Sequence, residues 1–349
     1  MIKNALKVSW RQIAKKKIDN LINLVGLTLG IGFYMIVAAY TWDVHQVNNS
    51  LKDKDQQYLL QSSYKKKGFG IDLTTIGALP KALYESYPQL VKNYFRMDGI
   101  TCIVSVKDAV YEESVALGDP TFLDMFGFSL WEGDPKTALL EPYTVVLTEQ
   151  AALKYFGKLD VLQEKLKIKN FNGEPALFSV SGVIKSSKEN SVMKLTPAME
   201  SELYVSISSE TFFGRSIDSW QNPYIAGFIT LQEGVQPAQL EQPINTLIQQ
   251  HTDSEFAAAY APAWKPLSTY FLTDNNAAVR NMISTLNWIA SFVLLMAVIN
   301  FINFSISQHL ARLKEIGVRK IIGSSTLQIT IQLLMEYLVM VAFAAILSL

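Results

Sequence analysis

The amino-acid sequence predicts a membrane protein with three α-helical transmembrane segments and a large α+β extracytoplasmic domain inserted between the first and the second. Three observations lead to this fold class. Of the 349 residues, 49% are hydrophobic and 18% are charged, whereas charged residues make up about a quarter of ordinary soluble proteins. The apolar excess is gathered into three long blocks. About 238 residues separate the first two blocks, which is enough for a domain with its own core.

Each apolar block has the length of a membrane-spanning helix. Residues 20–42 carry no charge, residues 283–307 lie inside a second charge-free window, and residues 329–349 contain Glu336 as their one charged residue. A helix needs about 20 such residues to cross about 30 Å of hydrocarbon. A cleaved signal peptide is the alternative for the first block, but its apolar region is too long, and two more blocks follow. We therefore expect three retained spans.

Basic residues on the short flanks predict the orientation. Residues 1–19, expected to form a cytoplasmic amphipathic helix, hold six Lys and Arg against Asp19. The segment 308–327 is also basic, so both flanks are expected on the cytoplasmic side. Residues 43–280 then lie outside, with 21 Lys and Arg against 28 Asp and Glu, a net charge of −7. We interpret this negative charge as a means of keeping the domain soluble rather than as a binding site for a cationic ligand. The net charge of the whole chain is zero, which excludes the large basic surface of a nucleic-acid binder.

The exterior residues 43–280 show a mixed pattern of strands and helices. β-branched and aromatic runs predict strands at 58–60, 100–106, 143–147, 178–184, 224–231 and 268–272. Helices are expected at 78–86 and at 148–157, where Thr148 suits the N-cap and Gly157 the residue after the C-cap. A third helix follows Pro237, and Pro243 either kinks it or marks a later start.

Motifs of catalytic or metal-binding chemistry are missing from the sequence. It contains no phosphate-binding G-x-x-x-x-G-K-[ST] loop, no H-E-x-x-H, no EF-hand pattern and no G-x-S-x-G. The three histidines (His45, His251 and His309) are far apart, and Cys102 is the one cysteine. We therefore predict a non-catalytic protein with no metal site and no cofactor of its own.

Residues 312–323 form a short basic link between the second and third spans. The link is expected to act as a rigid lever on the second span, or else as an ordinary basic anchor for anionic lipid heads. Its sequence, R-L-K-E-I-G-V-R-K-I-I-G, closely resembles the signature that follows the second transmembrane helix of FtsX-like, MacB-type ABC transporter permeases. In that family this turn is the coupling helix that docks on a separate ATPase subunit.

The resemblance extends over nearly the whole chain. Residues 10–30 look like the amphipathic N-terminal helix and first span of these permeases, and residues 118–126, 133–157 and 178–183 are similar to the MacB-type periplasmic core domain. Members have a fourth span, and many repeat the whole unit, whereas this sequence stops at Leu349. The sequence is therefore expected to be a fragment or a truncated first half, with the third span incomplete.

The resemblance implies a multi-pass permease in the bacterial inner membrane, with its N-terminus in the cytoplasm and its large domain in the periplasm. Its implied partners are an ABC ATPase that carries ATP and Mg, a second permease copy or half, membrane lipid and a periplasmic adaptor. The function implied is export or extrusion driven by motion of the periplasmic domain. A sensor of the same architecture that moves no substrate is the alternative. The residues expected to contact the ATPase are Arg312, Glu315, Ile316, Gly317, Val318, Arg319, Lys320 and Gly323.

Three residues inside the spans are further candidates. Gly26 and Gly30 form G-x-x-x-G, which permits close helix approach and suits either a contact between permease halves or local packing. Glu336 is an acid in an apolar span, where a carboxylate is unfavourable unless it is paired or lies near the membrane interface. We expect Glu336 to have a structural or coupling role, with an interfacial position as the alternative.

Overall fold

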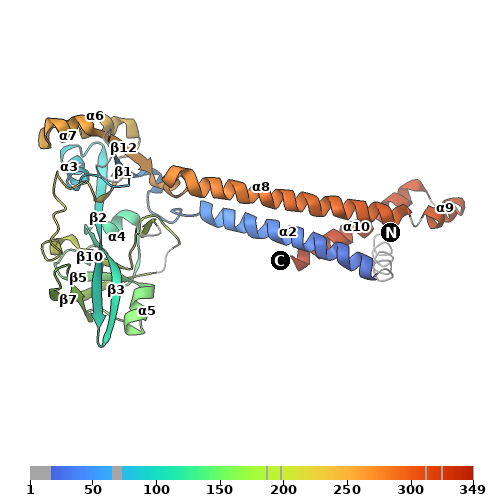
Figure 1. Ribbon diagram of the computed structural model, residues 1–349, viewed down its shortest axis with the longest axis horizontal. Coiled ribbons are helices and arrows are strands. Elements are labelled where there is room, and N and C mark those ends of the chain that lie inside the picture. The colour runs from blue at the N-terminus through green and yellow to red at the C-terminus, as the bar shows by residue number, and fades with distance from the viewer. Residues whose placement is uncertain are drawn as a thin grey trace. The chain divides into compact units, whose positions relative to one another are not determined.

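The computed structural model describes residues 17–64, 73–185, 188–196, 199–310, 313–323 and 325–348, and it divides the chain into two compact units. One unit comprises Gln46–Asp274, and the other comprises Met1–His45 with Asn275–Leu349. Most of the expected N-terminal helix, residues 1–16, lies outside the described part. Figure 1 shows the helices of the second unit and the β-rich exterior domain formed by the first.

The helical unit contains α2 (Lys17–His45), most of α8 (Leu267–Leu310), α9 (Leu313–Ile321) and α10 (Thr326–Leu347). Among the described residues, three segments are long and apolar enough to cross a membrane: Leu21–His45, Ala277–Gln308 and Ile329–Leu347. Many of their large apolar side chains are exposed, as expected of helices that face lipid rather than water. The three expected spans are therefore present as helices.

Helices α2 and α8 pack antiparallel. The amide of Asn287 donates to the hydroxyl of Thr41 at 3.0 Å, while Gly30, further back along α2, lies against Ala297, further along α8. Helix α10 lies against both, since Tyr337 Oη donates to the Ser305 carbonyl at 3.3 Å and α10 also contacts α2. These contacts make the three helices one bundle.

The exterior domain is built on a ten-stranded sheet. Its described strands are β1 (Gln57–Tyr64), β2 (Val91–Val106), β3 (Ala109–Gly118), β4 (Leu130–Glu132), β5 (Thr144–Thr148), β6 (Lys165–Lys169), β7 (Pro175–Ile184), β10 (Leu203–Ser206), β11 (Ala226–Leu231) and β12 (Tyr260–Pro266). The order along the sheet is β12-β1-β11-β2-β3-β10-β5-β7-β4, and β6 pairs with both β2 and β7. A separate hairpin is formed by β8 (Lys194–Thr196) and β9 (Met199–Glu200).

Strand β6 closes part of this sheet into a ring. The pairs β2–β3, β3–β10, β10–β5, β5–β7, β7–β6 and β6–β2 return to their starting strand. The interior is filled by apolar side chains from every strand of the ring and by α5 (Glu149–Phe156). The ring is therefore a packed core and not a channel, as is usual for barrels of few strands.

Two further cores lie outside the ring. One is aromatic and gathers around α4 (Phe122–Phe126), with Phe95, Phe228 and Tyr204 from the sheet. The other lies between β1, β11 and the start of β2 and the helices α3 (Leu79–Ser86) and α6 (Glu241–His251), which is followed by α7 (Ser254–Ala259). Single helical turns occur at η1 (Lys54–Gln56), η2 (Ile207–Ser209) and η3 (Pro237–Leu240).

The structure confirms the helix at 149–156 with the expected caps. The Thr148 hydroxyl accepts from the Ala151 amide at 3.1 Å, and Gly157 has a left-handed φ of 70°. The third helix begins late, at Glu241, so Pro243 lies in its first turn and does not kink it. The prediction of a strand at 268–272 was wrong, because these residues form the first turns of α8. Leu267 and Tyr270, three apart and both buried, require helical periodicity there.

Candidate functional site

The expected coupling segment forms helix α9, which is followed by Gly323 at a φ of 102°. Leu313, Gly317 and Ile321 are spaced four apart and therefore share one face of this helix. The side chains of Ile321 and Ile322 are 87% and 79% exposed, and Leu313 and Val318 are also exposed. Among the described residues, no atom outside the backbone of α9 comes within 4 Å of a Cβ placed on Gly317. Helix α9 thus presents an apolar surface with bare backbone at its centre.

Charged residues flank this apolar surface. Lys314 and Lys320 are exposed, and Ile316 is half-buried. Arg312 and the side chains of Glu315 and Arg319 lie outside the described residues. The structure therefore brings Ile316, Gly317, Val318, Lys320 and Gly323 together in one short segment, and their role in ATPase coupling stays a prediction.

Gly26 and Gly30 both face α8. A Cβ on Gly30 would lie 2.6 Å from Ala297 Cβ, closer than any real contact, whereas a Cβ on Gly26 would lie 3.9 Å from Asn300 Nδ2. The described structure thus uses Gly30 for close packing of α2 on α8 within the chain. A contact of these glycines with a second permease copy stays a prediction.

Glu336 is buried within the helical unit, with an exposed fraction of 7%. Its neighbour Tyr337 bonds to Ser305 of α8, which is also buried, so this turn of α10 packs against α8. The packing of α10 against α8 therefore encloses the Glu336 carboxylate. Its part in coupling or structure stays a prediction.

A buried ion pair in the exterior domain escaped sequence reasoning. Arg96 donates from Nε and Nη2 to the two carboxylate oxygens of Asp119, both at 2.9 Å, and its backbone amide donates to Asp119 at 2.8 Å. Arg96 also donates to the Gly77 carbonyl at 3.1 Å and to Asp218. The side chains of Arg96 and Asp119 are 2% and 3% exposed. This cluster gives a structural reason for Asp119 in the segment 118–126.

The charges in this cluster support one another. Burial alone lowers the pKa of Arg96, but Asp119 and Asp218 raise it above its ordinary value, so the guanidinium stays charged. Burial raises the pKa of Asp218, but its hydrogen bond and charge contacts with Arg96 and Lys81 bring it below the ordinary value. The cluster holds together β2, the end of β3 and the loops at Gly77 and Asp218. Its role is therefore structural.

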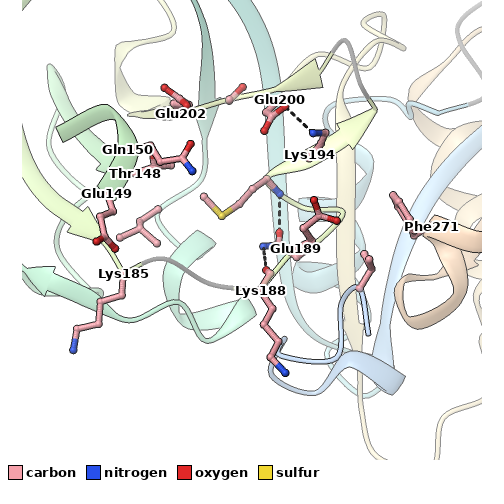
Figure 2. Close-up of a pocket in the computed structure, with 15 residues that line it drawn as sticks. Thr148, Glu149, Gln150, Lys185, Lys188, Glu189, Lys194, Glu200, Glu202 and Phe271 are labelled. Carbon is pink, nitrogen blue, oxygen red and sulfur yellow. Dashed lines mark hydrogen bonds and ion pairs between the residues drawn. The ribbon is translucent and has the colours of Figure 1, made fainter. Parts of the chain in front are cut away.

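A cavity of about 220 Å³ lies beside the N-terminus of α5 (Figure 2). Its apolar lining is Val47, Ile184, Met193 and Phe271, and its polar lining is Thr148, Glu149, Gln150, Lys185, Lys188, Glu189, Asn190, Lys194, Glu200, Ser201 and Glu202. In Figure 2 the ends of Lys185 and Lys188 point away from the other labelled residues, and Lys194 is paired with Glu200 at 3.0 Å. Burial, with the nearby Glu113 and Glu200, raises the pKa of Glu202 despite Lys154.

The side chains of the cavity do not form a catalytic arrangement that we can identify. Its Glu149 accepts from Trp131 Nε1 at 3.2 Å, and its other carboxylates come from two further segments, one with Glu189 and one with Glu200 and Glu202. Within the described ranges, no three His, Cys, Asp or Glu side chains are placed to hold a metal ion. Of the histidines, His45 contacts the Thr41 carbonyl and His251 stacks on Trp220. No motif in the sequence indicated this cavity, because its residues come from distant parts of the chain.

Comparison with known protein families assigns two parts of the chain to known domain families. Residues 21–247 match the family model of the MacB-like periplasmic core domain, and residues 287–349 match that of the FtsX-like permease C-terminal region. The second match includes α9. No curated protein matches the chain.

Three solved structures are similar to the chain at low identity. A domain described as that of a permease from Porphyromonas gingivalis is 22% identical, with a TM-score of 0.49 over 62% of this chain and 92% of that one. The periplasmic region of MacB from Actinobacillus actinomycetemcomitans is 13% identical, with a TM-score of 0.45 over 65% and 95%. The extracellular domain of the ABC-type transporter YknZ from Gram-positive bacteria is 15% identical, with a TM-score of 0.42 over 59% and 99%.

Proposed function

The chain belongs to the family of MacB-like, FtsX-like membrane permeases, and from this premise we propose that it is the permease subunit of an ABC transporter. ATP, with Mg, is bound and hydrolysed on a separate ATPase subunit, and this chain contributes no catalytic residue. The protein lies in the bacterial inner membrane with its N-terminus in the cytoplasm. A second permease copy or half, and a periplasmic adaptor, complete the assembly.

The exposed apolar surface of α9 is the observation that carries this proposal. Large apolar side chains on a short segment between two membrane helices are unfavourable in water unless a partner covers them. Ile321 and Ile322 are among the most exposed apolar side chains of the described chain. Lipid heads attract the lysines of α9, and the open space at Gly317 in addition lets a protein partner approach the backbone of the helix closely.

Helix α8 supplies the link from this surface to the exterior domain. It has 44 residues, and its first eight belong to the exterior domain while the rest belong to the helical unit, with a left-handed φ of 58° at Ala277 close to this boundary. Its first turn buries Leu267 and Tyr270 in the aromatic core of the exterior domain. Closure of the ATPase subunits moves α9, and α8 passes this motion to the core at its other end. The task served is export or extrusion from the cell envelope.

A sensor or regulator of the same architecture is the second candidate. The ring of strands is filled by its own side chains, so the exterior domain is suited to moving as a body rather than to conducting a substrate through that ring. Both candidates use the same coupling segment. They differ in whether an intact system moves a substrate or only relays a signal.

Affinity purification of the full chain with assay of the accompanying ATPase tests the proposal. We expect an ATPase to co-purify with the wild type, and I321D/I322D to lose both the subunit and the stimulated ATP hydrolysis. E315Q and G317L test the predicted coupling residues in the same assay. The control L153D places an aspartate on an exposed leucine of α5 and is expected to keep the ATPase.

Two outcomes contradict the proposal. If the wild-type protein purifies with no associated ATP hydrolysis, the permease function fails. If I321D/I322D retains full stimulated hydrolysis, the assignment of α9 as the docking surface fails. Stimulated hydrolysis without any transported substrate favours the sensor.

A further inference from the structure

Strand β6 carries three lysines on the outer face of the strand ring. Its sequence, Lys-Leu-Lys-Ile-Lys, alternates strictly, and Leu166 and Ile168 are fully buried in the ring core. Because successive side chains of a strand point to opposite faces, Lys165, Lys167 and Lys169 all point outward. Lysines two apart on a strand stand about 7 Å from one another.

The neighbouring strands add apolar side chains to the same face. Lys167 is paired in register with Ser105 of β2 and Leu177 of β7, and Lys169 is paired with Ile103 and Pro175. Ile103 and Leu177 are both exposed. Directly opposite residues on adjacent strands have Cβ atoms about 5 Å apart, so the lysines and apolar side chains form one continuous surface.

The turn between β6 and β7 projects an aromatic side chain beside this surface. Phe171 is 93% exposed. The turn that holds it is well fixed, because Asn170 Oδ1 accepts from the Glu174 amide at 2.9 Å and Asn170 Nδ2 donates to the Phe212 carbonyl at 2.9 Å. Gly173 supplies the left-handed φ of 81° that the turn requires.

These six residues, Lys165, Lys167, Lys169, Phe171, Leu177 and Ile103, are called the lysine patch below. In the part of the chain that the structure describes, no carboxylate lies within 4.0 Å of the three ammonium groups. Acids close to the patch in sequence or register have other contacts: Glu164 pairs with Lys158 at 3.2 Å, Glu174 accepts from Asn170, and Glu112 is opposite Ile103 on β3. On a domain of net charge −7, the patch is a local excess of positive charge.

We propose that the lysine patch docks the exterior domain on an anionic phospholipid surface. Three observations select lipid over a protein. The charge is all lysine, which is depleted at protein interfaces, where arginine is enriched. Long lysine stems beside exposed Phe and Leu match the interfacial layer of a bilayer, which accepts apolar side chains below the charged heads. Both ends of the domain continue into helices long and apolar enough to span a membrane, so the domain is tethered to a bilayer.

Binding of the full chain to added vesicles tests this assignment. The protein is held in discs of neutral phosphatidylcholine and mixed with vesicles of phosphatidylcholine, with or without phosphatidylglycerol, which are then floated. We expect co-flotation with the phosphatidylglycerol vesicles only, and weaker binding at high salt. Each lysine near an anionic surface contributes roughly fivefold, so K165Q/K167Q/K169Q is expected to bind on the order of a hundredfold more weakly.

Two further variants complete the test. F171S is expected to weaken binding with the lysines intact, and K165R/K167R/K169R is expected to keep it. The control K136Q/K185Q/K188Q removes the same charge from other segments of the domain and is expected to bind as the wild type does. All patch side chains face solvent, so thermal unfolding of each variant should match the wild type.

Three results overturn the proposal. Equal binding to neutral and anionic vesicles excludes recognition of the anionic heads. Unchanged binding of K165Q/K167Q/K169Q places the lipid contact elsewhere on the protein. Unchanged binding of F171S shows that the lipid contact is purely electrostatic. Patch-dependent binding of the full chain to polyglutamate, without binding to phosphatidylglycerol vesicles, makes the occupant an acidic protein.

Discussion

Asp119 is the residue whose loss should destabilise the exterior domain most among its charged residues. Its carboxylate accepts three hydrogen bonds from Arg96, and both side chains are removed from water. Removing Asp119 leaves the buried guanidinium with Asp218, whose side chain is 54% exposed, as its one carboxylate partner among the described residues. Breaking a buried pair typically costs about 3–5 kcal/mol. We expect Asp119→Ala to lower the unfolding free energy by that amount, as measured by chemical denaturation followed by circular dichroism.

An exposed ion pair provides the matched control. Asp124 contacts Lys52 at 3.2 Å, and both side chains are about half exposed. Exposed pairs contribute about 0–1 kcal/mol, so Asp124→Ala should change the unfolding free energy little. Similar small effects of both substitutions would contradict a stabilising role for the buried cluster.

Glu202 should make the stability of the exterior domain depend on pH. Its pKa is raised above the ordinary 4.5, mainly by burial, and Glu113 and Glu200 raise it further while Lys154 lowers it. The folded state therefore holds this proton more tightly than the unfolded state, and stability falls as the pH rises from about 4.5 through the raised pKa. Glu202→Gln removes this loss.

Thermal unfolding of the wild type and Glu202→Gln at several pH values checks this prediction. The two proteins should unfold at similar temperatures below pH 4.5, where the wild-type carboxyl is protonated. At neutral pH the Gln variant should unfold at the higher temperature. A difference that is constant across this range would show that the charge of Glu202 is not its cause.

At the scale of helices and strands, the sequence predicted those elements whose ends are determined by residues close to them in the chain. Thr148 and Gly157 fix the ends of α5 through bonds within a few residues, so the sequence alone was sufficient there. Strand β10 is only four residues long and buried on both faces, and its place between β3 and β5 depends on partners far along the chain. The alternation at 165–169 is a strand signal that sequence reasoning missed.

The candidate sites divide in the same way. The link 312–323 is continuous in sequence, so its helix could be expected from charge, apolar spacing and Gly323. The ion pair of Arg96 and Asp119 joins residues 23 apart, with Asp218 much further along, and nothing local indicates this pairing. A cavity assembled from several segments is likewise beyond a single sequence.

Gly30 should be the glycine on which the packing of α2 against α8 depends. Any Cβ at this position meets Ala297 at 2.6 Å, so the helices must separate. At Gly26 the same atom would lie 3.9 Å from Asn300, an ordinary contact. We expect Gly30→Ala to destabilise the detergent-solubilised full chain by about 1–3 kcal/mol, the usual range for overpacking, and Gly26→Ala to change it far less.

Unfolding of the two variants in detergent, followed by tryptophan fluorescence, measures this difference. The compensating pair Gly30→Ala with Ala297→Gly should recover part of the loss, because it restores the space between the helices. If Gly30→Ala is as stable as the wild type, the close approach of α2 and α8 is wrong. Equal losses for Gly26→Ala and Gly30→Ala would point to helix propensity rather than packing.

At the scale of the whole molecule, the boundary between the two units lies inside a helix. Helix α8 begins at Leu267, eight residues before the helical unit begins at Asn275. Leu267 and Tyr270 are buried in the aromatic core, Tyr270 Oη donates to the Leu195 carbonyl at 3.3 Å, and Asn48 donates to the Leu267 carbonyl at 2.7 Å. The start of α8 is therefore a structural part of the exterior domain, which is what a mechanical link requires.

This boundary predicts which fragment of the chain folds by itself. Residues 46–274 contain all three hydrophobic cores, so this fragment should be soluble and unfold in one cooperative transition. A fragment ending at Pro266 lacks Leu267 and Tyr270. Loss of each such buried side chain costs about 2–5 kcal/mol, a large part of a stability of about 5–15 kcal/mol. We expect the shorter fragment to be largely unfolded or strongly destabilised.

Point variants in the longer fragment separate the loss of packing from the loss of chain length. Tyr270→Ala should destabilise residues 46–274 by several kcal/mol. Phe271→Ala should destabilise them less, because Phe271 lines the cavity and is only half-buried. Equal transitions for the two fragments, or equal effects of the two variants, would show that the start of α8 is not anchored in the core. An axial push on α8 would then have no fixed point in the exterior domain, and the proposed transmission would need another path.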